Sequence, residues 1–324
     1  MRLFVTGATG FVGKATLRRL LAAGHNVVAA YHRTPPVEQE GVRWVRLGDQ
    51  DGPERLRDML DGSDAILHMA ALAHLPNTDK EHSADAFMRV NLDGTVRLAE
   101  AAVGARIRRF VFLSSVKACG ETSGARPLCE NDPKRPVDPY GVSKSIAEDR
   151  LGEIAARTAM EHVVIRPPLV YGPGVRANFL SLMRWIDRGL PLPLGAIDNR
   201  RSFLYVENLA DVVVRCLDHP AAAGQTYFVS DGEDVSIGEL VRRIARALER
   251  PARLVPAPMP LLRVIGRLLR KEAAVDRLTG SLAVDISRVR NQLEWQPPFS
   301  MDTGLRATAG WYRAMHPSRI RRDV

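Results

Sequence analysis

The sequence predicts an α/β fold, with a doubly wound parallel sheet and a smaller C-terminal lobe interleaved with it. Three observations predict this class. The first half of the 324-residue chain alternates short apolar runs with amphipathic segments, a glycine-rich turn follows the first run, and Pro and Gly become frequent after Arg166. Apolar strands that alternate with helices are typical of a parallel sheet buried on both faces. We therefore expect one unit over residues 1–166 and a second over 167–324.

The expected strands are apolar runs with few charges, and the expected helices have apolar positions at helical spacing. In chain order the strands are 2–6, 26–31, 42–46, 64–69, 109–114, 162–166, 201–206 and 225–229. The helices are 12–23, 83–103, 140–157, 178–188, 237–248, 260–271 and 302–314. We expect Gly24 and Gly104 to close the first two helices in the left-handed conformation.

The composition limits the class of partner. Hydrophobic residues make up 45% and charged residues 26%, which excludes wholesale disorder and a disulfide miniprotein. The net charge is +9, from 46 Lys and Arg against 37 Asp and Glu. Nucleic-acid binding uses basic residues interleaved with aromatic ones, and the sequence has no such stripe. We expect no nucleic-acid partner.

The cysteines indicate a reducing compartment. There are three, Cys119, Cys129 and Cys216, widely separated and without the pairing that metal sites use. The sequence has no signal-peptide pattern at its start and no apolar run near the ~20 residues that span a bilayer. We expect a cytoplasmic protein without a metal site.

The glycine-rich turn has the pattern of a dinucleotide site. Thr6-Gly7-Ala8-Thr9-Gly10-Phe11-Val12-Gly13 follows the first strand and opens the first helix. Gly7 allows the tight turn, Gly10 lets the backbone approach a pyrophosphate, and Gly13 lets helix pack on strand. The helix N-terminus directs its amides at the anion. We expect this Rossmann-type loop, with Thr9, Phe11 and Val12, to bind the cofactor.

The residues at the end of the second strand determine whether the site accepts an adenosine ribose with a 2′-hydroxyl or with a 2′-phosphate. An acid there binds the 2′-hydroxyl of NAD, whereas an arginine suits the 2′-phosphate of NADP. Here Tyr31 is followed by His32 and Arg33, and no acid is present. This favours NADP(H) over NAD(H), unless Arg33 is a solvated surface charge. Asp49, after the third strand, either accepts from the adenine amino group or caps a turn.

A serine, a tyrosine and a lysine supply proton-transfer chemistry. Ser115 follows the fifth strand, and Tyr140 and Lys144 share one face of a helix at i and i+4. The Lys144 ammonium, together with the charge of an oxidised nicotinamide, favours the phenolate and lowers the pKa of Tyr140. Ser115 adds a hydrogen bond to the reacting oxygen. We expect these three residues to be catalytic.

In this order, the glycine turn, Ser115, Tyr140 and Lys144 resemble the extended short-chain dehydrogenase/reductase family. The resemblance also includes His68-Met69-Ala70-Ala71, Asn91 and the segment 166–174, Arg-Pro-Pro-Leu-Val-Tyr-Gly-Pro-Gly. Within the family, the chain looks like the nucleotide-sugar epimerases, dehydratases and 4-ketosugar reductases. The resemblance implies a nucleotide-binding first unit, a sugar-nucleotide-binding second lobe, and a homodimer formed through helices 83–103 and 140–157.

The resemblance also implies individual contacts. On the cofactor side the implied residues are Ala70, Ala71, Leu72, Asn91, Lys144, Pro167, Leu169 and Val170. On the substrate side they are Asn178 at the diphosphate, Leu192 and Leu194 beside uracil, and Arg201 at a phosphate. Alternatives from the residues alone are that Asn178 caps its helix, that both leucines are core, and that Arg201 is a surface charge.

The chain departs from the family pattern at two places. The usual Arg-x-Gly-Asp segment is missing before Asp285, and Arg277 is the nearest cation that could replace it. Lys117 stands where common epimerases have an uncharged residue, and it either meets the substrate or points to solvent. This variant resembles a branch with reductases of UDP-4-keto-6-deoxy-N-acetylhexosamines and proteins labelled UDP-glucose 4-epimerases. We expect Cys119 to be a packing residue.

The resemblance implies hydride transfer at C4 of a UDP-linked sugar. The missing ribose-binding acid favours a 4-keto-sugar reductase with dissociable NADP(H), and the alternative is a UDP-glucose or UDP-N-acetylhexosamine 4-epimerase. A dehydratase needs an acid pair where Val116 and Lys117 stand. A cofactor-sensing regulator on this fold usually loses its tyrosine or lysine, and both are present here.

The segment 260–271 carries part of the positive charge. It reads Pro-Leu-Leu-Arg-Val-Ile-Gly-Arg-Leu-Leu-Arg-Lys, with leucines on one side and basic residues elsewhere. Such a segment either packs on the core with a solvated basic face or lies on an anionic membrane. We expect the packed helix and no membrane partner.

Overall fold

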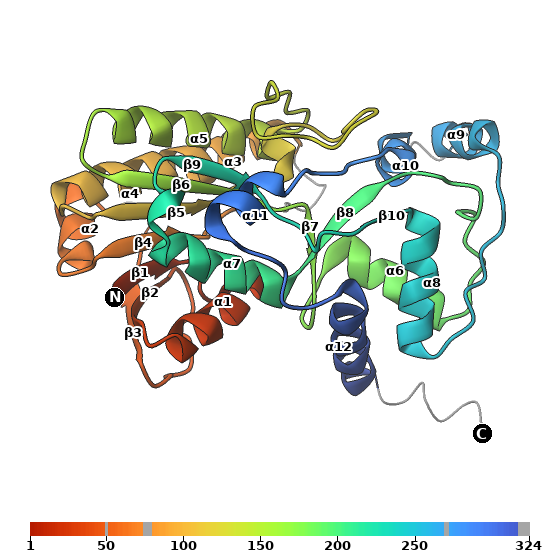
Figure 1. Cartoon of the computed structure of the whole chain (residues 1–324), viewed down its shortest axis with the longest axis horizontal. Helices are drawn as coiled ribbons and strands as arrows, with labels where there is room; N and C mark the ends of the chain where they lie inside the picture. The colour runs from red at the N-terminus through yellow and green to blue at the C-terminus, as the bar shows by residue number, and fades with distance from the viewer. Residues whose placement is uncertain (49–50, 74–79, 269–271, 317–324) are drawn as a thin grey trace.

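The computed structural model describes residues 1–48, 51–73, 80–268 and 272–316. It has two sheets lying end to end, a large one that includes the N-terminal strands and a small one formed mainly by the second half of the chain (Figure 1).

The large sheet confirms the predicted fold class. It has seven strands in the order β3-β2-β1-β4-β5-β6-β9, and each pairing is parallel. The strands are β1 (Arg2–Thr6), β2 (Asn26–Tyr31), β3 (Val42–Arg46), β4 (Ala65–His68), β5 (Arg109–Leu113), β6 (Glu161–Arg166) and β9 (Gln225–Phe228). The two central strands β1 and β4 are almost entirely buried, as expected for a sheet covered on both faces.

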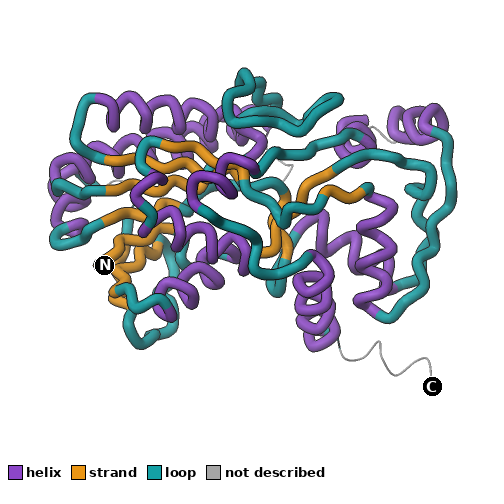
Figure 2. The backbone as a smooth tube through the Cα atoms, viewed as in Figure 1, coloured by secondary structure: helices purple, strands orange, loops and turns teal. Residues whose placement is uncertain are grey.

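Helices cover both faces of this sheet (Figure 2). One layer contains α1 (Phe11–Ala22), α7 (Val206–Asp218) and α11 (Ser287–Leu293). The other contains α2 (Pro53–Leu60), α4 (Gly94–Gly104) and α5 (Pro139–Ala156). Each layer closes its own core: Leu20 and Val213 lie under the first, and Leu60 and Leu151 under the second. This arrangement leaves the carboxyl ends of the strands free to carry loops.

The second lobe is built around a three-stranded sheet in the order β10-β8-β7. Its strands are β7 (Leu169–Tyr171), β8 (Arg201–Tyr205) and β10 (Asp234–Val235). Its helices are α6 (Ala177–Asp187), α8 (Ile237–Leu248), α9 (Met259–Leu268), α10 (Glu272–Thr279) and α12 (Met301–Met315). Between β8 and β10 the chain returns to the large sheet to form β9, so the two parts are interleaved.

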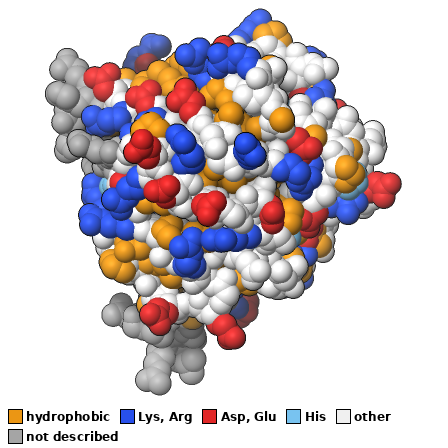
Figure 3. Space-filling model, turned by 90° about the vertical axis from the view of Figure 1, so that its left-hand side faces the viewer, with side chains coloured by type: hydrophobic (Ala, Val, Ile, Leu, Met, Phe, Trp, Pro, Cys, Tyr) orange, Lys and Arg blue, Asp and Glu red, His pale blue; other side chains and the backbone are white. Residues whose placement is uncertain are grey.

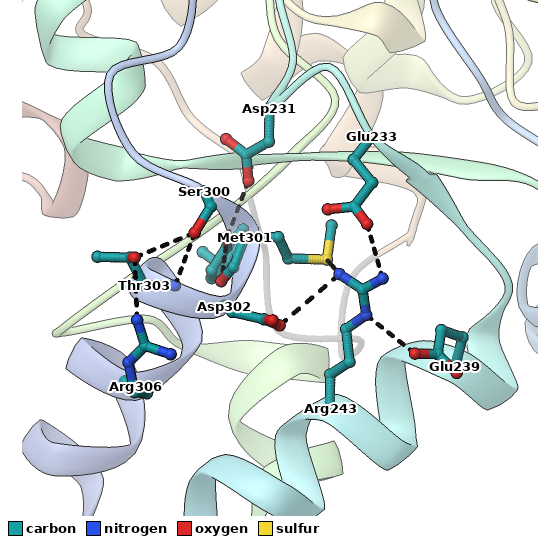
Figure 4. Close-up of polar contacts among 10 residues, drawn as sticks. Asp231, Glu233, Glu239, Arg243, Ser300, Met301, Asp302, Thr303 and Arg306 are labelled. Carbon is teal, nitrogen blue, oxygen red and sulfur yellow. Dashed lines mark hydrogen bonds and ion pairs between the residues drawn. The ribbon is translucent and has the colours of Figure 1, made fainter.

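Arg243 joins three segments of the second lobe (Figure 4). It projects from α8 and pairs with Glu233 before β10 at 2.6 Å, with Glu239 one turn back at 3.0 Å, and with Asp302 at the start of α12 at 3.7 Å. These carboxylates raise the pKa of the guanidinium further above its usual value. The charged cluster therefore fixes α12 against α8.

The predicted helix 83–103 is wrong as a single regular helix. The structure has α3 (Lys80–Phe87), a π-helical stretch η1 (Met88–Asp93), and then α4. Gly104 is also not the left-handed cap, because it is the last residue of α4 and the positive φ of 56° falls on Arg106. Gly24 does adopt the predicted left-handed conformation, with φ of 78°.

Helix α9 contains most of the predicted basic helix. Leu262 is buried in the core of the second lobe, as the packed alternative requires. Val264 and Leu268 are exposed beside Arg263 and Arg267, and residues 269–271 lie outside the described part. Within the described residues, no helix has both the length and the apolar character to cross a membrane. On the molecular end that carries β3 and α2, basic side chains are interspersed with acidic ones (Figure 3).

Candidate active site

The glycine loop lies between the end of β1 and the start of α1, and its close contacts require glycine. A Cβ on Gly13 would lie 2.0 Å from the carbonyl oxygen of Gly7, and one on Gly7 would lie 2.6 Å from the amide of Ala70. Gly7 also has a positive φ of 76°. Thr9 and Gly10 are exposed, while Phe11 and Val12 are half-buried. The loop therefore presents bare backbone at a helix N-terminus, which fits a pyrophosphate.

Tyr31 ends β2 next to this loop, because β1 and β2 are paired. The tyrosine is half-buried, and Arg33 is exposed in the following loop. An exposed arginine is compatible with both predicted roles of Arg33, a contact to the 2′-phosphate of NADP and a solvated surface charge. Asp49, the third residue expected around the adenosine, lies outside the described residues.

Ser115 and Tyr140 come together from distant parts of the chain. Ser115 follows β5 and begins the short 3₁₀ helix η2 (Val116–Ala118), whereas Tyr140 is in the first turn of α5. Ser115 lies close enough to the phenol to lower the pKa of Tyr140. Burial outweighs this effect and raises the pKa to about 12, and the charge of Asp138 adds to the rise. The predicted lowering of the pKa is therefore absent from the protein itself.

Lys144 is buried one turn further along α5. Its Nζ donates to the carbonyl oxygen of Leu113 at 2.7 Å and lies 4.2 Å from the centre of the Phe112 ring. Burial lowers the pKa of Lys144 to about 7, against an opposing effect of Glu148. The described contacts place the ammonium at the end of β5, below the serine.

Asn91 organises the segment after β4. It lies in the π-helical stretch η1 and is buried. Its Oδ1 accepts from the amide of Leu72 at 2.8 Å, and its Nδ2 donates to the Leu72 carbonyl and to Ser143 Oγ, each at 3.0 Å. Ser143 in turn donates to the Tyr140 carbonyl. Asn91 thus connects the predicted cofactor segment Ala70–Leu72 to the helix that carries Tyr140.

His68 ends β4 beneath the same segment. It is buried, stacks on Phe112, and shares hydrogen bonds with Thr6 at 2.6 Å and Thr95 at 3.0 Å. Burial and the nearby Lys144 lower its pKa to about 3, so the imidazole stays neutral. It acts as a structural link between β1, β4 and α4.

The three remaining predicted cofactor residues surround the start of β7. Pro167 is buried, and its carbonyl accepts from the amide of Val116 at 2.9 Å. Leu169 is exposed and Val170 is half-buried. This segment therefore adjoins the serine loop.

The structure places the predicted substrate residues in the second lobe. Asn178 is exposed in the first turn of α6, and it is not the cap, because the N-cap position is Arg176. The capping alternative is therefore wrong. Leu192 and Leu194 are both buried in the core of the lobe, where the packing alternative puts them.

Arg201 and Arg277 lie next to each other. Arg201 is half-buried at the start of β8, and its Nη1 donates to the carbonyls of Arg277 at 2.7 Å and Gly280 at 2.8 Å. Arg277 itself is exposed. Burial lowers the pKa of Arg201, and the charge of Glu121 opposes this shift. Part of the Arg201 guanidinium is thus used to hold the backbone around Gly280.

Lys117 is held by two carboxylates and does not point freely to solvent, and its contact with the substrate stays a prediction. Its ammonium is paired with Asp138, and it lies 2.9 Å from Glu121. The two carboxylates raise the pKa of the lysine in spite of its burial.

Two sets of residues around the site were not predicted from the sequence. Asp138 caps α5, and the pair Asp138-Pro139 carried the signal for it, because Pro is favoured in the first helical turn. Glu148 and Arg166 form a buried ion pair at 2.6 Å below the site. They are distant in sequence, and only the pairing of α5 with β6 brings them together. Cys119 is buried with a pKa raised to about 11, which fits a packing residue.

These groups can exchange a proton at one oxygen. The phenol of Tyr140 and the hydroxyl of Ser115 lie at the carboxyl edge of the sheet, on the same edge as the glycine loop. The bare backbone of Gly7 and Gly13 fits a dinucleotide, and the buried amine of Lys144 lies at the end of β5. Among the described residues, no cluster of acidic, histidine or cysteine side chains is suited to hold a metal ion.

Comparisons with known proteins agree with this geometry. The chain is 40% identical to a UDP-glucose 4-epimerase of Vibrio cholerae, over 95% of this chain and 94% of that protein. It is 30% identical to a GDP-6-deoxy-D-mannose reductase of Pseudomonas aeruginosa, over 94% and 95% of the two chains. The solved structure of MoeE5 in complex with UDP-glucuronic acid and NAD superposes with a TM-score of 0.78 at 26% identity, covering 97% of this chain and 100% of that one. The model of the NAD dependent epimerase/dehydratase family matches residues 3–238, and the chain belongs to that family.

Proposed function

We propose that this enzyme inverts the configuration at C4 of a UDP-linked hexose by oxidising and re-reducing that carbon. The observation that carries the proposal is that the start of α5 with Tyr140 packs directly on the loop of Ser115, beside the buried Lys144 and on the edge of the sheet that holds the glycine loop. The 40% identity with a UDP-glucose 4-epimerase supports the choice of reaction and of nucleotide. The predicted reductase becomes the second candidate.

In this reaction Tyr140 is the proton carrier. With Tyr140 as the phenolate, its oxygen takes the proton of the C4 hydroxyl as that carbon is oxidised, and it returns the proton when the carbonyl is reduced from the other face. Ser115 donates a hydrogen bond to the C4 oxygen of the sugar and holds that oxygen in line with the phenol. When bound, the dinucleotide would supply the acceptor and then the donor of the hydride. The glycine loop and Lys144 would hold it, and the protonated form of Lys144 would favour the phenolate of Tyr140.

The second candidate is a 4-keto-sugar reductase that uses NADPH. Two observations favour it. The pKa of Tyr140, raised to about 12, keeps its proton in place for donation to a ketone oxygen. Arg33, exposed after β2 where no acid follows the strand, suits the 2′-phosphate of NADP. The 30% identity with a GDP-6-deoxy-D-mannose reductase supports the same direction.

An NMR assay of the purified enzyme separates the two candidates. UDP-glucose and UDP-galactose are incubated with NAD, and a UDP-4-keto-hexose is incubated with NADH or NADPH. Interconversion of the two UDP-hexoses without net consumption of cofactor supports the epimerase. Stoichiometric oxidation of NADPH by the keto sugar, without interconversion of the hexoses, would instead establish the reductase.

Tyr140→Phe tests the role of the phenol in either reaction. We expect turnover to fall by about 10²- to 10⁴-fold, the usual contribution of a positioned proton carrier. Binding of the dinucleotide, measured by calorimetry, should stay within a few-fold of wild type. Tyr227→Phe is the matched control, because Tyr227 lies in β9 and donates to Gln292, away from the site. A Tyr140→Phe enzyme with normal turnover would rule out the mechanism.

A further inference from the structure

Lys117 links the serine loop to the start of the catalytic helix. It is the second residue of η2, two positions after Ser115, and its side chain reaches across to the residue that precedes α5. Its ammonium pairs with the carboxylate of Asp138 and lies 2.9 Å from Glu121. The lysine is half-buried, so solvent screens these interactions only in part.

The carboxylate of Asp138 makes two contacts at once. Its Oδ2 takes the hydrogen bond from Lys117, and its Oδ1 accepts from the amide of Gly141 at 2.7 Å as the N-cap of α5. The cap therefore fixes Lys117 to the same turn of helix that carries Tyr140. A lysine bound only to solvent or to substrate would have no such connection.

The two backbones are also in direct contact here. A Cβ on Gly141 would lie 2.4 Å from the carbonyl oxygen of Lys117, so only glycine lets the helix approach this closely. On the other side, the amide of Lys117 donates to Ser115 Oγ at 3.2 Å. Lys117 thus contacts Asp138 through its side chain, α5 through its carbonyl oxygen and Ser115 through its amide.

We propose that Lys117 is a positioning residue, which holds Tyr140 against Ser115 and neutralises the carboxylate of Asp138 beside the phenol. The inference rests on the proposed function, since it assigns Lys117 a part in the proton transfer by Tyr140. The inference also explains why a lysine stands at this position. Among the described contacts, Lys117 touches neither the phenol of Tyr140 nor the glycine loop.

The charges around the phenol explain why neutralisation matters. Burial and the charge of Asp138 raise the pKa of Tyr140, and the nearby Ser115 lowers it. The ring of Phe87 packs edge-on at 6.1 Å, and Lys144 lies one turn below on α5. Behind Lys117, Glu121 faces both this lysine and Arg201. Loss of the Lys117 charge would leave Asp138 unpaired and make the phenolate of Tyr140 harder to form.

A double-mutant cycle tests the inference in the full-length enzyme. The variants are Lys117→Met, Asp138→Asn and the two combined, and asparagine caps a helix as well as aspartate does. We expect Lys117→Met to lower kcat about tenfold with KM within about twofold of wild type, as for a coupled pair of neighbours. The combined variant should return to within about threefold of wild type, because the unpaired carboxylate is gone. Lys117→Arg should retain most of the activity.

The matched control is Arg126→Gln, which breaks an exposed ion pair with Asp132 in the same connection between η2 and α5. It should leave kcat unchanged. A rise in KM for Lys117→Met at constant kcat would overturn the inference in favour of a substrate contact. Wild-type kinetics of Lys117→Met, or a combined variant as slow as the single one, would also overturn it. If Lys117→Met does not fold, the combined variant alone decides: a kcat within about threefold of wild type supports the inference, and a kcat about tenfold lower overturns it.

A second measurement separates this inference from the proposed function. Enzyme labelled with carbon-13 at the tyrosine Cζ reports the ionisation of Tyr140 directly, and Tyr140→Phe assigns its resonance. Lys117→Met should move the titration of this resonance to higher pH, and Asp138→Asn should move it to lower pH. These shifts do not depend on the substrate. Their absence would overturn the role of Lys117 even if the enzyme epimerises UDP-hexoses, whereas an enzyme inactive on UDP-hexoses leaves this test intact.

Discussion

Lys144 donates a hydrogen bond from its Nζ to the carbonyl oxygen of Leu113, 2.7 Å away in the interior of the protein. Burial lowers its pKa to about 7, from an ordinary value of 10.5. Between these two values the unfolded chain binds more protons than the folded one. The free energy of unfolding should therefore rise with pH in this range, by up to about 1.4 kcal/mol per pH unit from this residue.

Lys144→Met removes this contribution. Urea denaturation of the cofactor-free protein at pH 7, 8 and 9 should show a steeper rise for wild type than for the variant. The difference between the two proteins isolates Lys144 from other groups that titrate. Parallel curves would show that the lysine keeps an ordinary pKa in the folded state.

Glu148 and Arg166 form a second buried relationship, below the same site. Arg166 donates from Nη2 to Glu148 Oε2 at 2.6 Å, and their side chains are only 6% and 4% exposed. Glu148→Gln leaves the guanidinium buried without its charge partner, so we expect a loss of about 3–5 kcal/mol in the free energy of unfolding. The double variant Glu148→Leu/Arg166→Met should lose less free energy of unfolding than Glu148→Leu or Arg166→Met alone, because it leaves neither charge of the pair buried without its partner. Additive losses in denaturant titrations would contradict this coupling.

Much of the fold was predictable from the sequence, because the apolar runs of a buried parallel sheet are strong local signals. The strands 2–6, 26–31 and 42–46 and the helix 237–248 match the structure residue for residue. The π-helical stretch η1 was not predictable in this way. Asn91 in this stretch bonds to Leu72, a tertiary contact that the local apolar pattern does not encode.

The candidate site was predictable where chemistry requires a specific residue and not where packing decides. Gly7 and Gly13 are specified by close backbone contacts, and Ser115 and Tyr140 were predicted from the proton transfer proposed for them. The environment of Lys117 could not be read from the sequence, because Asp138 reaches it only after α5 has packed on η2. The pKa of Tyr140 also depends on burial, which no motif encodes.

Gly13→Ala should damage both stability and cofactor binding. Its Cβ would lie 2.0 Å from the Gly7 carbonyl oxygen and 2.7 Å from two backbone atoms of Ala8, and backbone cannot move aside as a side chain can. We expect a loss of about 1–3 kcal/mol in the free energy of unfolding, and weaker binding of NAD in calorimetry, since the same backbone forms the proposed pyrophosphate site.

Gly310→Ala is the matched control for this substitution. Gly310 lies inside α12, and no atom lies within 4 Å of the position of its Cβ. Alanine there should raise the free energy of unfolding by about 0.5–1 kcal/mol, because it is a better helix former. A Gly13→Ala protein with wild-type stability and affinity would mean that α1 can shift away from β1 without cost.

Asp231 connects the two parts of the molecule through its buried carboxylate. Its Oδ1 accepts from the amide of Tyr205 and from Asn208 Nδ2, and its Oδ2 accepts from the hydroxyl of Tyr171, each at 2.8 Å. The Tyr171 hydroxyl also lies 3.2 Å from the Met301 carbonyl at the start of α12. The residue thus joins β7, β8, α7 and α12.

The donors around Asp231 predict different costs for two substitutions. In Asp231→Asn the retained oxygen can keep its two bonds, while Tyr171 turns its proton to Met301 and accepts from the new amide. We expect this variant to lose about 1 kcal/mol in the free energy of unfolding. Asp231→Ala leaves three buried donors without their acceptor and should lose about 3 kcal/mol or more. Denaturant unfolding measures both. Equal losses in the two variants would show that the carboxylate charge, rather than its geometry as an acceptor, stabilises the junction.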